Sequence, residues 1–141
     1  MTWRRTTSGD GAFSSLFRDD SEKDAESWWF LPYDQLNLAF FEGKESYGII
    51  LIESEEQGKR RPYHKQKLSF LLSNLRHFAL EAQSDNVPVL HFTTTVQYDE
   101  ALNGILQEIG TINMFKPAER ELRMTLKPLV DEGRINVHEH P

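Results

Sequence analysis

Short apolar runs alternate with longer amphipathic stretches along most of the chain, and this alternation restricts the fold more than any other feature. Runs of this length that are apolar almost throughout are typical of strands buried on both faces of a sheet. The apolar runs cover residues 28–31, 47–52, 87–92, 111–115 and 135–138. Apolar residues recur at helical spacing in residues 62–83, 98–109 and 117–132.

Strands that alternate with helices form right-handed βαβ units, which build a parallel sheet covered by helices on both faces. We therefore predict an α/β fold, namely a three-layer Rossmann-like domain with a five-stranded, mostly parallel sheet. Residues 34–46, between the first two strands, have room for a short helix over 36–41 that makes the first crossover.

Length and composition bound the protein class. A chain of 141 residues fits one domain with a proper core. Its net charge of −6 argues against binding nucleic acid or an anionic membrane alone, since both need a basic face. Cysteine is absent, which excludes disulfides, a cysteine nucleophile and a cysteine-held iron–sulfur cluster within this sequence. No apolar run approaches the length of a membrane span, so we expect a cytoplasmic protein.

Residues 1–27 have the composition of a flexible N-terminal segment. Thr6 to Gly11 are turn formers, and Asp19 to Glu26 are mostly charged. Phe13, Leu16 and Phe17 have the spacing of a short helical turn. We predict a solvated tail here, followed by an α/β domain over residues 28–141.

Polar residues follow the predicted strands at the points where these strands end. In open α/β sheets, ligands bind beyond the carboxyl ends of the strands. Asp34 and Gln35 follow the first strand and have the hydrogen-bonding groups to contact a heterocycle. An equally good interpretation is that Asp34 caps the next helix and Gln35 is solvated. Glu53 closes the second strand, and a structural ion pair with Lys67 or His64 is a better interpretation than a catalytic carboxylate.

The longest helical stretch starts with an unusual charge pattern. Pro62 suits the first helical position, and Lys65 and Lys67 follow beside the apolar stripe. Positive charge at a helix N-terminus opposes the helix dipole, so the pattern favours an anionic partner nearby. Phe70 shares the opposite face with Asn74 and His77, which suggests that another helix, a partner or a further domain covers this face.

Several common site motifs are missing from the sequence. It has no glycine-rich phosphate loop, no Walker lysine motif and no glycine-flanked serine elbow. His138 and His140 form a possible metal pair, but a frayed chain end is the better interpretation because no third ligand lies nearby in sequence.

One series of motifs resembles a known family. The series runs Tyr33-Asp34-Gln35-Leu36-Asn37, Glu53-Ser54, Arg61-Pro62-Tyr63-His64-Lys65-Gln66-Lys67-Leu68, Asn74-Leu75-Arg76-His77-Phe78-Ala79, Lys116-Pro117-Ala118-Glu119-Arg120-Glu121-Leu122-Arg123 and Glu132-Gly133-Arg134-Ile135. It is similar to the N-terminal domain of deoxyribodipyrimidine photolyase-related proteins, the bacterial photolyases and cryptochromes that carry an iron–sulfur cluster. The match spans residues 28–140 in order.

The resemblance implies the antenna-type α/β domain of a light-driven flavoprotein. In that family a helical domain follows, which holds FAD, the cluster and the DNA lesion. Some members bind a ribityl-lumazine antenna near the strand ends. The resemblance places such a cofactor site at Asp34, Gln35, Leu36, Glu53, Tyr63, His64 and Lys67. Tyr33 stands where many members have glycine, and its ring would narrow that site.

The resemblance also bears on activity and partners. This sequence ends where the family's linker begins, so we expect an isolated domain that is not catalytic alone. Its expected roles are to bind an antenna chromophore or to dock a separately encoded helical domain. The alternative is a small nucleotide-binding or protein-interaction module of the same architecture without photochemistry.

Overall fold

The computed structural model describes residues 3–7, 12–54 and 65–140, with the side chains of residues 65–68 left undescribed. Within these described residues, six strands form one sheet in the order β1-β4-β3-β2-β5-β6. All neighbouring strands run parallel except β1, which pairs antiparallel with β4. The predicted mostly parallel α/β sheet is confirmed, and β1 is an addition to it. The strands are β1 (Trp3–Arg5), β2 (Ser27–Phe30), β3 (Tyr47–Ser54), β4 (Val89–Thr94), β5 (Ile112–Phe115) and β6 (Ile135–His138).

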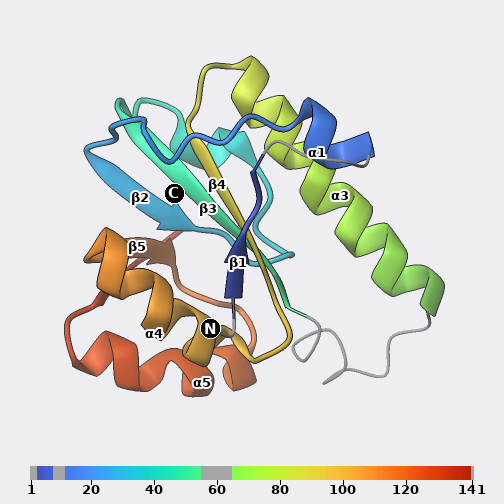
Figure 1. Cartoon of the computed structure of the whole chain (residues 1–141). Helices are drawn as coiled ribbons and strands as arrows, with labels where there is room; N and C mark the ends of the chain where they lie inside the picture. The colour runs from blue at the N-terminus through green and yellow to red at the C-terminus, as the bar shows by residue number, and fades with distance from the viewer. Residues whose placement is uncertain (1–2, 8–11, 55–64, 141) are drawn as a thin grey trace.

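The helices cover both faces of the sheet (Figure 1). Helix α3 lies on one face with the short α1, and α4 and α5 lie on the other. The predicted crossover between the first two strands is a 3-10 helix, η1, capped by the Asn37 side chain, which accepts from the Ala39 N–H. The helices are α1 (Ala12–Leu16), η1 (Leu38–Phe41), α3 (Lys65–Ser84), α4 (Tyr98–Ile109) and α5 (Arg120–Asp131).

Two apolar cores follow from this layering, because side chains of successive strand residues point to opposite faces. Phe30, Ile50 and Ile52 face α4 and α5, whereas Trp29, Leu31 and Leu51 face α3 and η1. Strand β3 lies inside the sheet, and from Gly48 to Ser54 it is buried throughout. This pattern explains why its sequence is apolar without alternation.

The N-terminal segment differs from its expectation as a flexible, solvated tail. Trp3 stands edge-on to Phe92, with ring centroids 5.3 Å apart, and its indole lies over Gly104 of α4. A Cβ atom on Gly104 would come within 2.3 Å of the Trp3 indole nitrogen, so only glycine leaves room for the ring. The segment thus closes the β4 edge of the sheet.

A buried carboxylate fixes the end of the same segment. Asp20 has no exposed surface and accepts hydrogen bonds from the Arg18 guanidinium (2.6 Å), the Gln83 amide (2.8 Å) and the Val89 N–H (2.9 Å). Burial by itself raises the pKa of Asp20, but the hydrogen bonds from Arg18, Val89 and Gln83 together hold this pKa below its usual value. The charge-rich stretch was predicted as solvated because these partners lie far away in the sequence.

Candidate functional site

The carboxyl ends of the parallel strands lie along one edge of the sheet, and the chain reverses its direction of travel across the sheet at β2. From β2 the chain builds β3 and β4 on one side, then returns to build β5 and β6 on the other. The loops that follow β2 and β5 therefore diverge at the boundary between these two strands. In open α/β sheets such a switch point is where ligands bind.

Gln35 lies at this switch point with part of its amide unused. Its side chain is 3% exposed, and its Nε2 donates two long hydrogen bonds of 3.4 Å to the carbonyl oxygens of Phe115 and Lys116. Its Oε1 is buried and has no hydrogen-bond partner in the part of the chain that the structure describes. Gln35 thus joins the loops after β2 and β5 and leaves one acceptor oxygen open. The interpretation of Gln35 as solvated is wrong.

Two tyrosines lie at the same edge. Tyr98 is the first residue of α4 and is almost fully buried, and its ring centroid lies 6.4 Å from that of Tyr33. The Tyr33 hydroxyl oxygen accepts from the Ser54 N–H at 3.4 Å. Among the described residues the Tyr98 hydroxyl has no strong hydrogen bond, and a weak one to the Tyr33 hydroxyl contributes to its raised pKa.

Burial and negative charge keep both phenols protonated. Burial raises the pKa of Tyr98 well above its usual value, and the neighbouring Tyr33 and the charges of Asp34 and Glu119 add to the rise. Burial and the Glu53 charge likewise raise the pKa of Tyr33. Asp34 follows β2 and Glu119 follows β5, so negative charges from both loops of the switch point act on Tyr98.

Glu53 is buried at the end of β3 and binds two basic side chains. The Arg76 guanidinium holds both carboxylate oxygens, at 2.9 and 3.1 Å, and Nε2 of His91 lies 2.5 Å from Oε2. Burial by itself raises the pKa of Glu53, but the bonds from His91 and Arg76 outweigh it and lower this pKa. The other ring nitrogen of His91 lies 2.5 Å from the Thr6 hydroxyl.

The predicted structural ion pair at Glu53 therefore exists, but with Arg76 and His91. Both carboxylate oxygens of Glu53 are occupied by these partners. His64 lies outside the described residues, and so does the side chain of Lys67, although its backbone belongs to α3. Sequence reasoning missed His91 because it sits within an apolar strand and was counted as part of the core.

Of the remaining predicted site residues, Asp34 and Leu36 are described by the structure and Tyr63 is not. Asp34 is exposed beside Gln35, and Leu36 is half-buried against the core that faces α3. Asp34 does not cap the following helix, because Asn37 does so. Tyr63 lies outside the described residues. Tyr98 was missed as a site residue, although its place at the start of the helix after a parallel strand was a usable signal.

The C-terminal histidines pack onto the sheet instead of fraying. Nε2 of His138 lies 2.9 Å from the Asn113 amide oxygen, and Nε2 of His140 lies 3.0 Å from the Lys116 carbonyl oxygen. The His140 ring also stacks on Phe115. Across the described ranges, no three metal-ligating side chains come together. None of the described helices is long and apolar enough to cross a membrane.

One comparison with known proteins identifies a family for this chain. The model of one family, deoxyribodipyrimidine photo-lyase-related protein, matches residues 30–141. A search of curated proteins finds no match. The family match takes in every strand from the end of β2 to β6 and all the residues of the switch point. Because it covers well over half of the sequence, the chain belongs to the deoxyribodipyrimidine photolyase-related protein family.

Proposed function

We propose that this chain is an antenna-type domain of a photolyase-related flavoprotein and that it binds a chromophore of the ribityl-lumazine class at the switch point between β2 and β5. The observation that carries the proposal is the buried Oε1 of Gln35, which has no hydrogen-bond partner among the described residues. A buried acceptor without a donor costs free energy, and a ligand N–H group placed there would recover it.

The donors and acceptors at the switch point fit the polar groups of such a chromophore. A lumazine ring carries an imide N–H flanked by two carbonyls, and its ribityl chain carries hydroxyls. The Gln35 oxygen can accept from the N–H group. The protonated hydroxyl of Tyr98 can donate to a ring carbonyl. The exposed carboxylate of Asp34 can accept from ribityl hydroxyls at the rim.

When bound, the chromophore would absorb near-ultraviolet or blue light and pass the excitation to a flavin. The protein's own part is to hold the ring at a fixed orientation with the buried Gln35 and Tyr98. The absence of cysteine means that this sequence does not fit a cysteine-held iron–sulfur cluster. In our proposal FAD and the cluster belong to a helical domain, and catalysis takes place there.

Replacing Gln35 with leucine tests the chromophore site. We expect the variant to bind 6,7-dimethyl-8-ribityllumazine about tenfold more weakly, because the acceptor for the ring N–H is lost. The stability of the variant should change little, since the two hydrogen bonds that it loses are long. The substitution also removes the buried Oε1 atom, which has no partner among the described residues. Titration of lumazine fluorescence measures the binding, and urea unfolding measures the stability.

The matched control is Gln107→Leu, which makes the same change on an exposed position of α4 and should leave binding unaltered. Lumazine binding that is equal in Gln35→Leu and the unaltered protein would contradict the proposed site. A wild-type protein that takes up no lumazine would contradict the antenna role itself.

A helical FAD-binding domain of the same family is the partner that we propose for the bound antenna. Excitation transfer requires a flavin acceptor. The helical domain would bring its FAD close to the lumazine when it docks on the α/β domain. We expect the two proteins to co-purify, and we expect lumazine fluorescence to fall when the flavin-loaded domain is added. Separate elution of the two, with unquenched lumazine, would contradict the partnership.

A further inference from the structure

Tyr33 lies at the switch point, and the chromophore contacts proposed above do not use it. It belongs to the loop after β2, and its half-buried ring packs against both apolar cores. Its hydroxyl reaches the last residue of β3, where the Ser54 N–H donates to the Tyr33 oxygen at 3.4 Å. The side chain therefore extends from the loop after β2 to the carboxyl end of the neighbouring strand.

The Tyr33 oxygen accepts hydrogen bonds from two donors. Besides the Ser54 N–H, it interacts weakly with the Tyr98 hydroxyl. Burial is the main cause of the raised pKa of both tyrosines, but their mutual hydrogen bond raises the pKa of Tyr98 and acts to lower that of Tyr33. These opposite effects are those of a bond donated by Tyr98, because such a bond stabilises the protonated donor and the ionised acceptor. Both acceptor positions of the Tyr33 oxygen are thus used.

The hydroxyl hydrogen of Tyr33 remains available to a ligand. A phenol has one O–H donor, and no described residue accepts a hydrogen bond from this one. Burial and the charge of Glu53 raise the pKa of Tyr33, so the hydroxyl is protonated at neutral pH. Because the oxygen accepts from Ser54 and Tyr98, its hydrogen must point away from both of them.

Tyr33 and Gln35 reach opposite sides of β2. The Gln35 amide donates to the carbonyl oxygens of Phe115 and Lys116 at the end of β5, whereas the Tyr33 hydroxyl lies at the end of β3. Strands β3 and β5 are the two neighbours of β2, so these side chains reach points about two strand spacings apart, roughly 10 Å. A ligand that lies across the end of β2 can therefore contact Gln35 with one end and Tyr33 with the other.

We propose that Tyr33 is a second anchor for the chromophore and that its hydroxyl donates to an oxygen of the ribityl chain, while the ring N–H donates to Gln35. This inference rests on the proposed function and adds a binding residue to it. The ribityl chain is the part of the chromophore that carries oxygen acceptors away from the imide. Ribityl hydroxyls both accept and donate, so the same chain can accept from Tyr33 and donate to the exposed Asp34 carboxylate.

Removing one partner at a time tests this anchor. The two ligands are 6,7-dimethyl-8-ribityllumazine and 6,7,8-trimethyllumazine, which has the same ring with a methyl group in place of the ribityl chain. Tyr33→Phe should weaken binding of the ribityl ligand about fivefold, as for loss of one hydrogen bond, and leave the affinity for the trimethyl ligand unchanged. Gln35→Leu should weaken both, because both carry the ring N–H. Fluorescence titration measures the affinities, and circular dichroism checks the fold.

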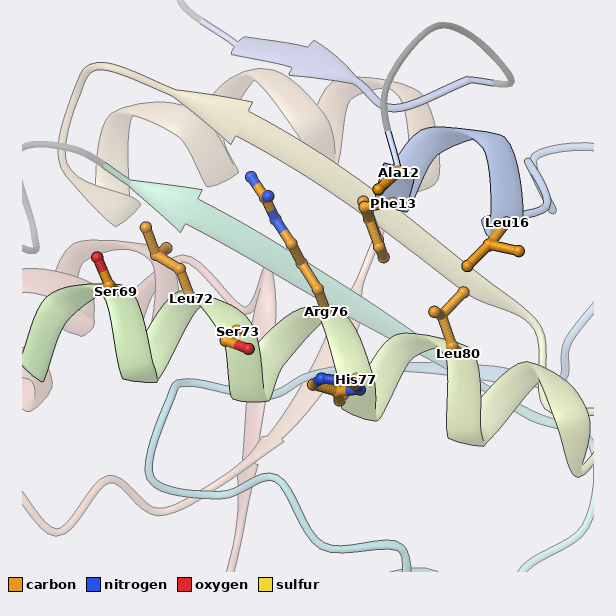
Figure 2. A pocket seen from close by; sticks show the side chains of 9 residues that line it. All are labelled: Ala12, Phe13, Leu16, Ser69, Leu72, Ser73, Arg76, His77 and Leu80. Carbon is orange, nitrogen blue, oxygen red and sulfur yellow. The ribbon is translucent and has the colours of Figure 1, made fainter. Parts of the chain in front are cut away.

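Two control variants separate this anchor from other modes of binding. Tyr47→Phe removes a hydroxyl at the first residue of β3, at the opposite edge of the sheet, and should alter neither affinity. An open groove of about 420 Å³ between α1 and α3 is another place where an aromatic ligand can bind (Figure 2). Leu16→Glu puts a charge on the exposed lining of that groove and should also alter neither affinity.

The inference is overturned if Tyr33→Phe changes the affinity for neither ligand. It is also overturned if Tyr33→Phe weakens both ligands equally, which is the effect of a purely structural role. Either result, with Gln35→Leu still weakening both ligands, would leave the proposed function intact and remove only the Tyr33 anchor. An unaltered protein that binds neither ligand, or binding that only Leu16→Glu abolishes, would overturn the proposed function and this inference with it.

Discussion

Trp29→Ala is expected to lower the free energy of unfolding by roughly 3–5 kcal/mol, the usual loss for a large buried aromatic side chain. Trp29 is 4% exposed and stacks on Phe115 with centroids 4.8 Å apart, while Phe41 and His138 meet its ring at 5.5 and 4.7 Å. It also pairs with Asn113 in the register between β2 and β5. Its removal thus loosens the strands that define the switch point.

Urea unfolding followed by circular dichroism measures this loss without relying on tryptophan fluorescence. Trp29→Phe should recover part of the stability, because a smaller ring still packs on Phe115. Val137→Ala, at an exposed position of β6, should change stability by no more than about 0.5 kcal/mol. A loss at Trp29→Ala as small as that of Val137→Ala would show that β2 and β5 do not depend on this ring.

Asp20→Ala is expected to cost roughly 2–4 kcal/mol, because it leaves the buried Val89 N–H without its acceptor and removes one of the two acceptors of the Gln83 amide. The variant should also lose a pH dependence. The folded state lowers the pKa of Asp20 below its unfolded value, so the stabilisation is fully present above the unfolded pKa. It disappears as the pH falls below about 4, through the folded pKa.

Unfolding free energies measured between pH 3 and pH 7 check both parts of this prediction. The unaltered protein should lose more stability than Asp20→Ala as the pH falls. Glu22→Ala removes an exposed carboxylate from the same loop and should have a small effect. Equal effects of Asp20→Ala and Glu22→Ala would mean that the N-terminal segment adds little to the folded state.

The core strands and long helices were predictable because their signals are local. Residues 98–109 were expected as a helix and residues 135–138 as a strand, and both bounds agree with the structure. The third strand was expected from residue 87 and begins at Val89. Such helices and strands can be recognised from the spacing of their apolar residues, because the same spacing repeats along the whole segment.

The N-terminal segment was not predictable because each of its anchors binds a residue far along the chain. Trp3 contacts Gly104, Thr6 contacts His91, and Arg18 binds Gln83. Single apolar residues among turn formers carry no period, so sequence reasoning assigned them to a solvated tail. The burial of Asp20 was hidden for the same reason.

Gln35 was expected to follow the first strand, and it does lie in the loop after β2. The strand order that sets this loop beside the one after β5 was not predicted from the sequence. Glu53 was expected to bind groups from the start of α3, whereas its partners are Arg76, further along that helix, and His91 on the neighbouring strand. Long side chains contact residues one helical turn or one strand away. The spacing of residues in the sequence does not show which of these contacts form.

The glycine of α4 that lies under the Trp3 indole couples the two ends of the sequence energetically. Position 104 and the first strand are separated by about a hundred residues, yet a side chain at the former would evict the ring at the latter. Gly104→Ala should therefore destabilise a protein that has Trp3 far more than one in which Trp3 has been replaced by alanine. A double-mutant cycle on the two positions would measure this coupling.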